Sequence, residues 1–284
     1  MARAGAPSGG RTWPAAGASP TPAIARTQHG HSAAKGDALA LRLRPWALGA
    51  VGGSAHRGTV CNLYRQDVSQ SRISSFLEPS ELKLSGQARG RNVEPGYVGA
   101  DADGPVLVHA GATASGAWEN KASGALDLLS LRWGFPPVMK GKRPITNIRN
   151  LESSWWTGVN GEFVTDARYR CLVPFAAFAE WNREPERNSW FEIGCEAPMF
   201  AGVWRPWTGE RLKDVGKARR QRREDDWKLY AFLTTEPNSV VAPVHPQAMP
   251  VILTEPEECE RWMAGGAESL ELQRPLPDGL TTLS

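Results

Sequence analysis

The sequence has little of what defines several protein classes. Its 284 residues include only four cysteines, Cys61, Cys171, Cys195 and Cys259. None forms a C-x-x-C pair, which argues against a disulfide scaffold or a cysteine-rich zinc site. No apolar run approaches the ~18 residues of a transmembrane helix. Tyrosine is scarce at 4 residues, whereas tryptophan is abundant at 12, and indole rings commonly form large rigid contact surfaces.

The net charge of +3 conceals two parts of opposite sign. Residues 1–59 hold seven Lys or Arg and one Asp, a charge of +6, so residues 60–284 carry 26 basic and 29 acidic residues, a charge of −3. The basic character therefore belongs to the leader, and overall charge is no evidence for nucleic-acid binding.

The first 59 residues do not have the composition of a folded domain. Ala, Gly and Pro supply 30 of them, so we expect a disordered leader. A secretory signal fits poorly, because the best apolar stretch, Ala38–Ala50, is interrupted by two arginines and a proline. Many Pro and Gly also disfavour an amphipathic transit peptide. A bacterial GTG codon encodes Val within a frame and Met at a start, so we favour initiation at Val60 and one domain over 60–284.

Within 60–284 the pattern predicts short strands and few helices. The expected strands are Val106–Val108, Leu128–Trp133, Cys171–Val173, Phe175–Trp181, Trp190–Ile193, Phe200–Trp204, Lys228–Thr234 and Met249–Leu253. The expected helices are Leu151–Val159 and Glu255–Met263, the latter with Pro256 in its first turn. This arrangement favours an α+β domain with a mixed, mostly antiparallel sheet. We interpret the basic stretch Arg211–Arg223 as a solvated loop, with a phosphate-contacting loop as the alternative.

Several sequence motifs follow one another along this domain. In order they are Cys61-Asn62-Leu63-Tyr64, Arg132-Trp133-Gly134-Phe135-Pro136-Pro137, Thr146-Asn147-Ile148-Arg149, Arg170-Cys171-Leu172-Val173-Pro174, Phe178-Ala179-Glu180-Trp181, Ala201-Gly202-Val203-Trp204, Thr234-Thr235-Glu236-Pro237-Asn238 and His245-Pro246-Gln247-Ala248-Met249-Pro250. Together they resemble the SOS-response-associated peptidase (SRAP) family, the abasic-site-processing proteins.

The resemblance implies a bacterial cytoplasmic protein, associated with the nucleoid when it acts, that binds abasic sites in single-stranded DNA. It implies Cys61 as an N-terminal nucleophile that becomes covalently linked to the abasic site. Asn147, Glu180 and His245 would be its catalytic companions. The residues implied to contact DNA are Arg149, Trp133, Trp181 and Arg170. The resemblance implies no metal, no organic cofactor and no membrane, and we expect a monomer.

The chemistry of these residue types is consistent with that role. An abasic sugar is in equilibrium with an open-chain aldehyde, which an N-terminal cysteine can capture first as an imine and then as a thiazolidine. An α-amine has an ordinary pKa of ~7.7–8.0 and is substantially neutral near pH 7, unlike a lysine amine at ~10.4. Glu180 and His245 are the expected acid–base pair, and Asn147 would orient the reactants.

This chemistry requires a free amine on Cys61. In the full sequence that nitrogen is an amide to Val60, so it is neither basic nor nucleophilic. Initiation at codon 60 followed by methionine removal would free it. The family's peptidase name suggests a second route, in which the Cys61 thiol attacks the preceding peptide bond with help from Glu180. Lyase activity is also implied by the resemblance.

Structural alternatives exist for each candidate. Cys61 could be a small buried hydrophobe, and Glu180 could form an ion pair with Arg168 or Arg170. His245 could cap a turn. Trp133 and Trp181 could be core residues instead of platforms for DNA bases.

The sequence departs from the family pattern at three places. The stretch Gly99–Lys121 and the insertion 206–226 are longer than the family core requires, and we expect both outside the site. The residues that follow His245 also have a different spacing from that of many members.

Two rival functions remain. The first is an N-terminal-nucleophile cysteine amidohydrolase or peptidase, which would turn over small amides. The second is a non-catalytic single-strand-binding module, whose binding would be lost at high salt and would survive Cys61→Ser.

Overall fold

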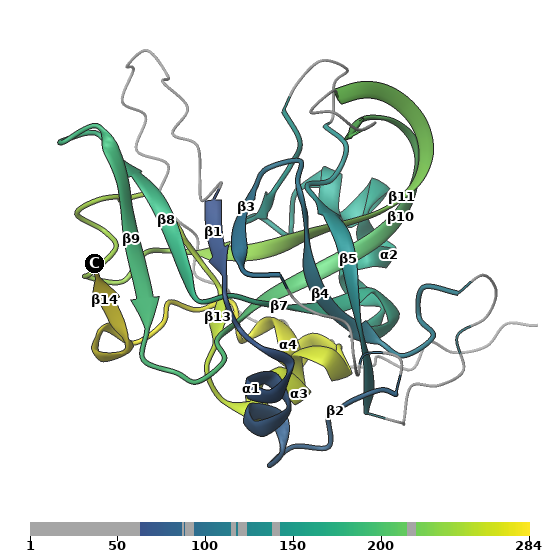
Figure 1. The fold of residues 1–284 in the computed structure, drawn as a ribbon, viewed down its shortest axis with the longest axis horizontal. Coiled ribbons are helices and arrows are strands. Elements are labelled where there is room, and N and C mark those ends of the chain that lie inside the picture. The colour runs from purple at the N-terminus through teal and green to yellow at the C-terminus, as the bar shows by residue number, and fades with distance from the viewer. Residues whose placement is uncertain are drawn as a thin grey trace, which may run out of the picture. The chain divides into compact units, whose positions relative to one another are not determined.

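The computed structural model describes residues 63–86, 88, 94–114, 118, 124–137, 143–214 and 220–284 (Figure 1). Its strands are β1 (Leu63–Gln66), β2 (Lys83–Leu84), β3 (Gly96–Gly99), β4 (Asp103–His109), β5 (Ala125–Trp133), β6 (Asn147–Ile148), β7 (Arg170–Pro174), β8 (Ala177–Asn182), β9 (Arg187–Ile193), β10 (Met199–Asp214), β11 (Arg220–Thr235), β12 (Met249–Pro250), β13 (Ile252–Leu253) and β14 (Thr281–Leu283). Its helices are α1 (Gln70–Leu77), α2 (Gly161–Thr165), α3 (Pro256–Ala264) and α4 (Ala267–Leu270), with a π-helix η1 (Trp155–Val159) and 3₁₀ turns η2 (Ala167–Tyr169) and η3 (Asp278–Leu280). The expected leader 1–59 lies outside these described residues.

Two sheets account for the strands in the described part of the chain. One has five strands in the order β14-β9-β8-β1-β3, and the other has nine, with a main path β12-β11-β10-β7-β4-β5-β2. Strand β6 pairs with β11, and β13 pairs with β10. The pairings are antiparallel except those of β11 with β5 and β6, and of β2 with β5. The predicted α+β class, with a mostly antiparallel sheet and few short helices, is confirmed.

Buried aromatic side chains join the two sheets. The ring of Tyr64 in β1 lies 5.3 Å from Trp133 in β5, 5.7 Å from Phe200 in β10 and 6.5 Å from Phe232 in β11, measured between centroids. Phe178 in β8 also contacts Phe200, at 6.4 Å. All five side chains are fully buried. Since aromatic rings bury large apolar areas and add favourable edge-to-face contacts, this cluster holds the five-stranded sheet against the nine-stranded one.

The predicted strands all fall on observed ones. Val106–Val108 lies in β4, Leu128–Trp133 in β5, Cys171–Val173 in β7, Phe175–Trp181 mostly in β8, Trp190–Ile193 in β9, Phe200–Trp204 in β10, Lys228–Thr234 in β11 and Met249–Leu253 in β12 and β13. The predicted helix at Glu255–Met263 is α3. The predicted helix at Leu151–Val159 is present only in part, as η1, because a turn occupies its first residues.

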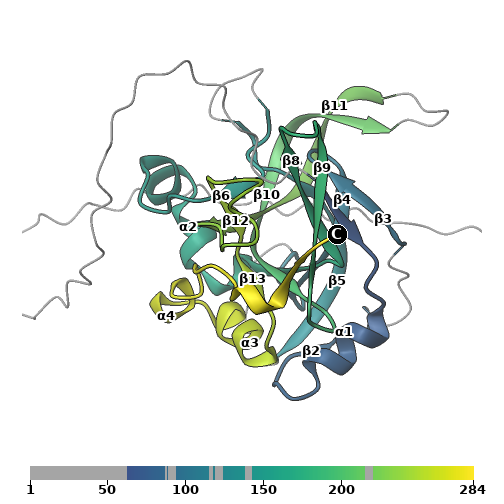
Figure 2. The ribbon, with the colours of Figure 1, turned by 90° about the vertical axis from the view of Figure 1, so that its left-hand side faces the viewer.

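Helix α1 was not predicted. Its N-cap Ser69 accepts a hydrogen bond from the Arg72 amide, and Ile73, Phe76 and Leu77 are buried. Helices α1, α3 and α4 lie at the same end of the molecule (Figures 1 and 2). No helix among the described residues is long and apolar enough to cross a lipid bilayer.

The prediction of a loop at Arg211–Arg223 was wrong at both ends of that stretch, which lie in β10 and β11, while residues 215–219 lie outside the described part of the chain. Strands β10 and β11 instead pair continuously from Gly202↔Phe232 to Asp214↔Arg220, and the resulting hairpin extends from the rest of the fold (Figure 2). Trp207 and Trp227 are directly opposed across it. Aromatic cross-strand pairs of this kind stabilise a two-stranded ribbon, which offsets the poor strand propensity of the surrounding charged residues.

One buried arginine ties the hairpin to the sheet. Arg211 donates to the Asp101 carboxylate at 2.8 Å and to the Gly134 carbonyl at 2.6 Å. Arg132 donates to the same Asp101 oxygen at 3.2 Å. Asp101 has a positive φ of 61°, a conformation that is uncommon for a residue with a side chain. The shared carboxylate, in the turn between β3 and β4, therefore holds the outer part of the hairpin against the sheet.

Candidate functional site

The proposed nucleophile, Cys61, lies outside the described residues, which begin at Leu63 in β1. Leu63 pairs with Ala179 of β8. Strand β1 therefore runs alongside the strand that carries Glu180.

Glu180 is buried, with only 1% of its surface exposed. It pairs with Ser189 of β9 near the end of β8. Because side chains alternate along a strand, Glu180 shares the inner face of β8 with Phe178, and Trp181 projects from the opposite face. The carboxyl group is therefore held on the side of the sheet that packs against the aromatic cluster. Removing such a group from water is costly unless other polar groups satisfy it.

Asn147 begins β6, a two-residue strand that runs parallel to β11. Its backbone pairs with Phe232, and its side-chain Nδ2 donates to the Thr146 hydroxyl at 2.8 Å. The Thr146 carbonyl in turn accepts a hydrogen bond from the indole of Trp133 at 3.1 Å. These contacts fix Asn147 at the edge of the aromatic cluster.

His245 lies in the turn between β11 and β12 and is buried. Its Nδ1 lies 2.8 Å from the Ala248 carbonyl oxygen and 3.3 Å from the Ala248 amide nitrogen. The shorter contact has the usual length of an N–H···O bond, so we assign the proton to Nδ1. The lone pair then lies on Nε2, which is buried and has no hydrogen-bond partner among the described residues. This is the tautomer of a neutral imidazole that can accept a proton at Nε2.

The end of β11 brings Asn147 and His245 into one region. Strand β6 pairs with Phe232 and Leu233, and β12 pairs with Thr234 and Thr235. The guanidinium of Arg149, just after β6, donates to the carbonyl of Gln247 in the turn that holds His245. The fold thus brings into one region residues that are almost 100 positions apart along the chain.

Two of the expected DNA contacts are at the surface. Trp181 has 52% of its surface exposed on the outer face of the five-stranded sheet. Arg149 is also exposed, although its guanidinium already contacts the Gln247 carbonyl.

The expectation of a DNA contact needs correction at Trp133. Its ring is fully buried and stacks on Phe232 at 5.0 Å. A ring that packs against other rings on the inside of a sheet has no face open to a base.

Arg170 requires the same correction. It is 1% exposed, its guanidinium lies 3.9 Å from the ring of Trp262, and it donates to the Ser269 hydroxyl at 3.1 Å. Burial lowers its pKa to about 10. Desolvation penalises the charged form of this guanidinium, and the face of the Trp262 indole partly compensates for that penalty. Arg170 is therefore a buried cation inside the fold.

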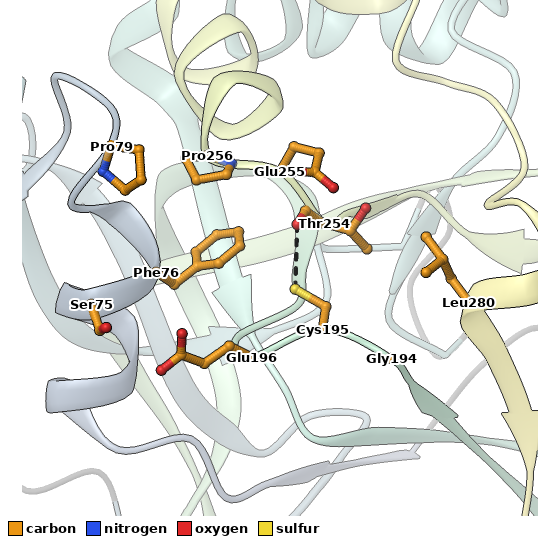
Figure 3. A pocket seen from close by; sticks show the side chains of 10 residues that line it. All are labelled: Ser75, Phe76, Pro79, Gly194, Cys195, Glu196, Thr254, Glu255, Pro256 and Leu280. Atoms are coloured by element: carbon orange, nitrogen blue, oxygen red, sulfur yellow. Dashed lines mark hydrogen bonds between the residues drawn. The ribbon is translucent and has the colours of Figure 1, made fainter.

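The three described cysteines do not compete with Cys61 as nucleophiles. Burial raises the pKa of the Cys171, Cys195 and Cys259 thiols, which disfavours the reactive thiolate. Cys195 lines a pocket of about 350 Å³, where its thiol donates to the Thr254 carbonyl at 3.3 Å (Figure 3). None of the expected site residues lines this pocket.

Sequence reasoning missed one residue next to the site. Gln273, in the loop after α4, donates to the carbonyls of Arg149 and Thr234. A single glutamine in a loop belongs to no motif, so only the fold reveals these contacts.

Solved structures support the fold. A Bordetella bronchiseptica protein superposes with a TM-score of 0.55 at 16% identity, covering 79% of this chain and 98% of its own. A Bacteroides thetaiotaomicron protein gives 0.53 at 18% identity, covering 78% and 90%. A phage-related protein from Bordetella bronchiseptica gives 0.50 at 19% identity, covering 79% and 93%. At these identities the likeness concerns the fold alone. No match was found among curated proteins.

A family model gives the more specific result. The model described as "SOS response associated peptidase (SRAP)" matches residues 60–282. The match begins at Val60, directly before Cys61, and it includes every residue of the candidate site described above. With most of the chain covered, this protein belongs to the SRAP family.

Proposed function

We propose that this protein captures abasic sites in single-stranded DNA as a covalent thiazolidine on Cys61. Membership in the SRAP family associates the protein with DNA damage and the SOS response. The crosslinking chemistry is our proposal beyond that association.

One observation carries the proposal. Strand β1 begins two residues after Cys61 and pairs with β8 at Ala179, directly before the buried Glu180. The first described strand after the nucleophile in the chain therefore runs beside the strand that carries a buried carboxyl group, which supports the proposal.

The reaction needs no cofactor. The neutral α-amine of Cys61 adds to the open-chain aldehyde, and loss of one water gives an imine. The Cys61 sulfur then bonds to the imine carbon, and its proton is transferred to the nitrogen to complete the thiazolidine ring. The balance is protein plus DNA minus one water, with no change of oxidation state.

Each companion residue has a distinct role. Glu180 transfers protons at the amine and the departing water, because it directly follows Ala179, the residue of β8 that pairs with the first residue of β1. His245 accepts a proton at Nε2 when the sugar ring opens, in the tautomer that its contact with Ala248 favours. Asn147 orients the sugar or the amine by hydrogen bonding without taking up charge.

The DNA strand itself would contact Trp181 and Arg149, which are exposed. An exposed indole stacks on a base without sequence preference, and an arginine pairs with a phosphate. Trp133 and Arg170 have no part in this contact because both are buried.

Intact mass spectrometry tests the proposal. The protein is expressed from its native gene and incubated with an oligonucleotide that carries one abasic site. We expect a free mass that begins at Cys61 and a denaturant-stable adduct of protein plus oligonucleotide minus water. Cys61→Ala should give no adduct, and Glu180→Gln and His245→Gln should slow its formation by about 10²-fold or more.

Controls distinguish the rival functions. A variant with one extra residue before Cys61 retains the thiol but has no free amine there, so the proposal requires it to form no adduct unless that residue is removed. Turnover of small amides without a DNA adduct would favour the amidohydrolase. Binding that is reversed by salt and unaffected by Cys61→Ala would favour the binding module.

A further inference from the structure

The short ladder between β6 and β11 is extended by a side chain. Backbone pairing ends at Ile148↔Leu233. Arg149 and Thr234 are the next residues after this pair, and Gln273 Nε2 lies 2.9 Å from the carbonyl oxygen of each. A primary amide has two N–H protons, so a single nitrogen donates to both carbonyls. Gln273 thus joins the two strands where they stop pairing with each other.

The side chain of the same arginine reaches the histidine turn. The Arg149 guanidinium donates to the Gln247 carbonyl, and the next residue, Ala248, holds His245 through Nδ1. A continuous series of contacts therefore runs from Gln273 through the backbone and side chain of Arg149 to His245. Arg149, whose carbonyl Gln273 contacts, is also only two residues along the chain from Asn147.

We propose that Gln273 is a positioning residue for the SRAP reaction. By holding the Arg149 carbonyl, it sets the direction in which the Arg149 side chain leaves β6, and Arg149 then fixes the turn that keeps the proton on His245 Nδ1. Nε2 is left as the acceptor. This inference rests on the proposed function for its catalytic consequence, although the geometric claim can be tested without DNA.

Two substitutions separate hydrogen bonding from packing. Gln273→Glu keeps the shape and replaces the donor by an acceptor, which opposes both carbonyls. Gln273→Leu keeps most of the volume and removes the polar group. The matched control is Arg274→Gln at the next position, which removes an ion pair with Glu258, a residue outside this series of contacts.

The first measurement is the ¹⁵N NMR spectrum of the His245 ring in the DNA-free protein, in mildly alkaline buffer. We expect one Nδ1-protonated tautomer in the unmodified protein and in Arg274→Gln. In both Gln273 variants we expect a mixture of tautomers, because the turn is no longer held. An unchanged tautomer in both well-folded Gln273 variants would overturn the inference.

The second measurement is the single-turnover rate of adduct formation against DNA concentration. Loss of alignment at a reacting group lowers the rate at saturation, and we expect about a tenfold decrease for Gln273→Glu with little change in the half-saturating concentration. An altered half-saturating concentration with an unchanged maximal rate would also overturn the inference. If the unmodified protein forms no adduct, the proposed function fails, and the NMR result alone decides the role of Gln273.

Discussion

Trp133 and Trp181 show how differently the fold treats two residues that the sequence suggests for one role. Trp133 is fully buried at the point where the two sheets meet, and Trp181 has half its surface exposed on the outer face of the five-stranded sheet. Both belong to family motifs, and both were expected to contact DNA. The interior ring joins strands β1, β5 and β11 through contacts with Tyr64 and Phe232, whereas the exposed ring is available to a ligand.

This difference teaches that a motif position does not define a role. At Trp181 the role follows from the alternation of side chains along β8, which places Trp181 on the outer face and its neighbour Glu180, 1% exposed, on the inner face. Interior positions in this protein should therefore affect stability, and outward positions should affect DNA binding. Substitutions at the two tryptophans and at buried polar groups test that division.

Trp133→Ala has the largest expected effect. Truncating a buried indole removes its packing and leaves a cavity, which costs about 3–5 kcal/mol. Urea unfolding should show this loss. Trp133→Phe, which retains a ring, should cost clearly less. If Trp133→Ala left stability intact and weakened only DNA binding, the division between interior and exposed residues would be wrong.

Trp181→Ala is expected to act on binding. Base stacking on an aromatic side chain contributes about 1–3 kcal/mol per base, so affinity for single-stranded DNA should fall by roughly 5- to 150-fold. Fluorescence anisotropy on an intact oligonucleotide measures it, and Trp181→Phe should preserve part of the affinity. Unfolding should change by no more than about 0.5 kcal/mol. An unchanged affinity would remove Trp181 from the proposed DNA contact.

Tyr64→Phe tests the polar contact inside the aromatic cluster. The hydroxyls of Tyr64 and Tyr230 lie 2.7 Å apart, and burial raises the pKa of Tyr230 well above its ordinary value. Loss of one hydroxyl deprives Tyr230 of this bond at a cost of about 1–3 kcal/mol. We expect the Tyr64→Phe/Tyr230→Phe double variant to be less destabilised than the sum of the singles, as measured by a double-mutant cycle. Additive losses would mean that the two hydroxyls do not depend on each other.

His109→Gln should have the smallest effect, which depends on pH. Burial lowers the His109 pKa below 6.5, against the opposing effect of its hydrogen bond to the Met263 carbonyl. The unfolded state then binds a proton at higher pH than the folded state does, so His109 costs stability as the pH falls through 6.5 toward the folded-state pKa. Thermal unfolding at about pH 7.5 and pH 5 should show a larger acid loss for the unmodified protein than for the variant. Equal losses would contradict this assignment.

Much of the fold followed from local patterns. Alternating apolar residues located the predicted strands, and Pro256 with acidic residues after it located α3. The hairpin of β10 and β11 was missed because its strands are charged and their stability comes from the Trp207–Trp227 pair and from Arg211 binding Asp101. Those contacts join residues that local sequence does not relate.

The sequence by itself determined membership in the SRAP family, because its motifs occur in the family's order, and the proposal that Cys61, Asn147, Glu180 and His245 carry the chemistry comes from that membership. Only the tertiary structure decided which way the side chains point. It buried Trp133 and Arg170, left Trp181 exposed, and joined the Arg149 side chain to the turn of His245 through the Gln247 carbonyl. The physical reason is that burial and hydrogen bonding depend on which strands meet, and strand pairing joins segments far apart in the chain.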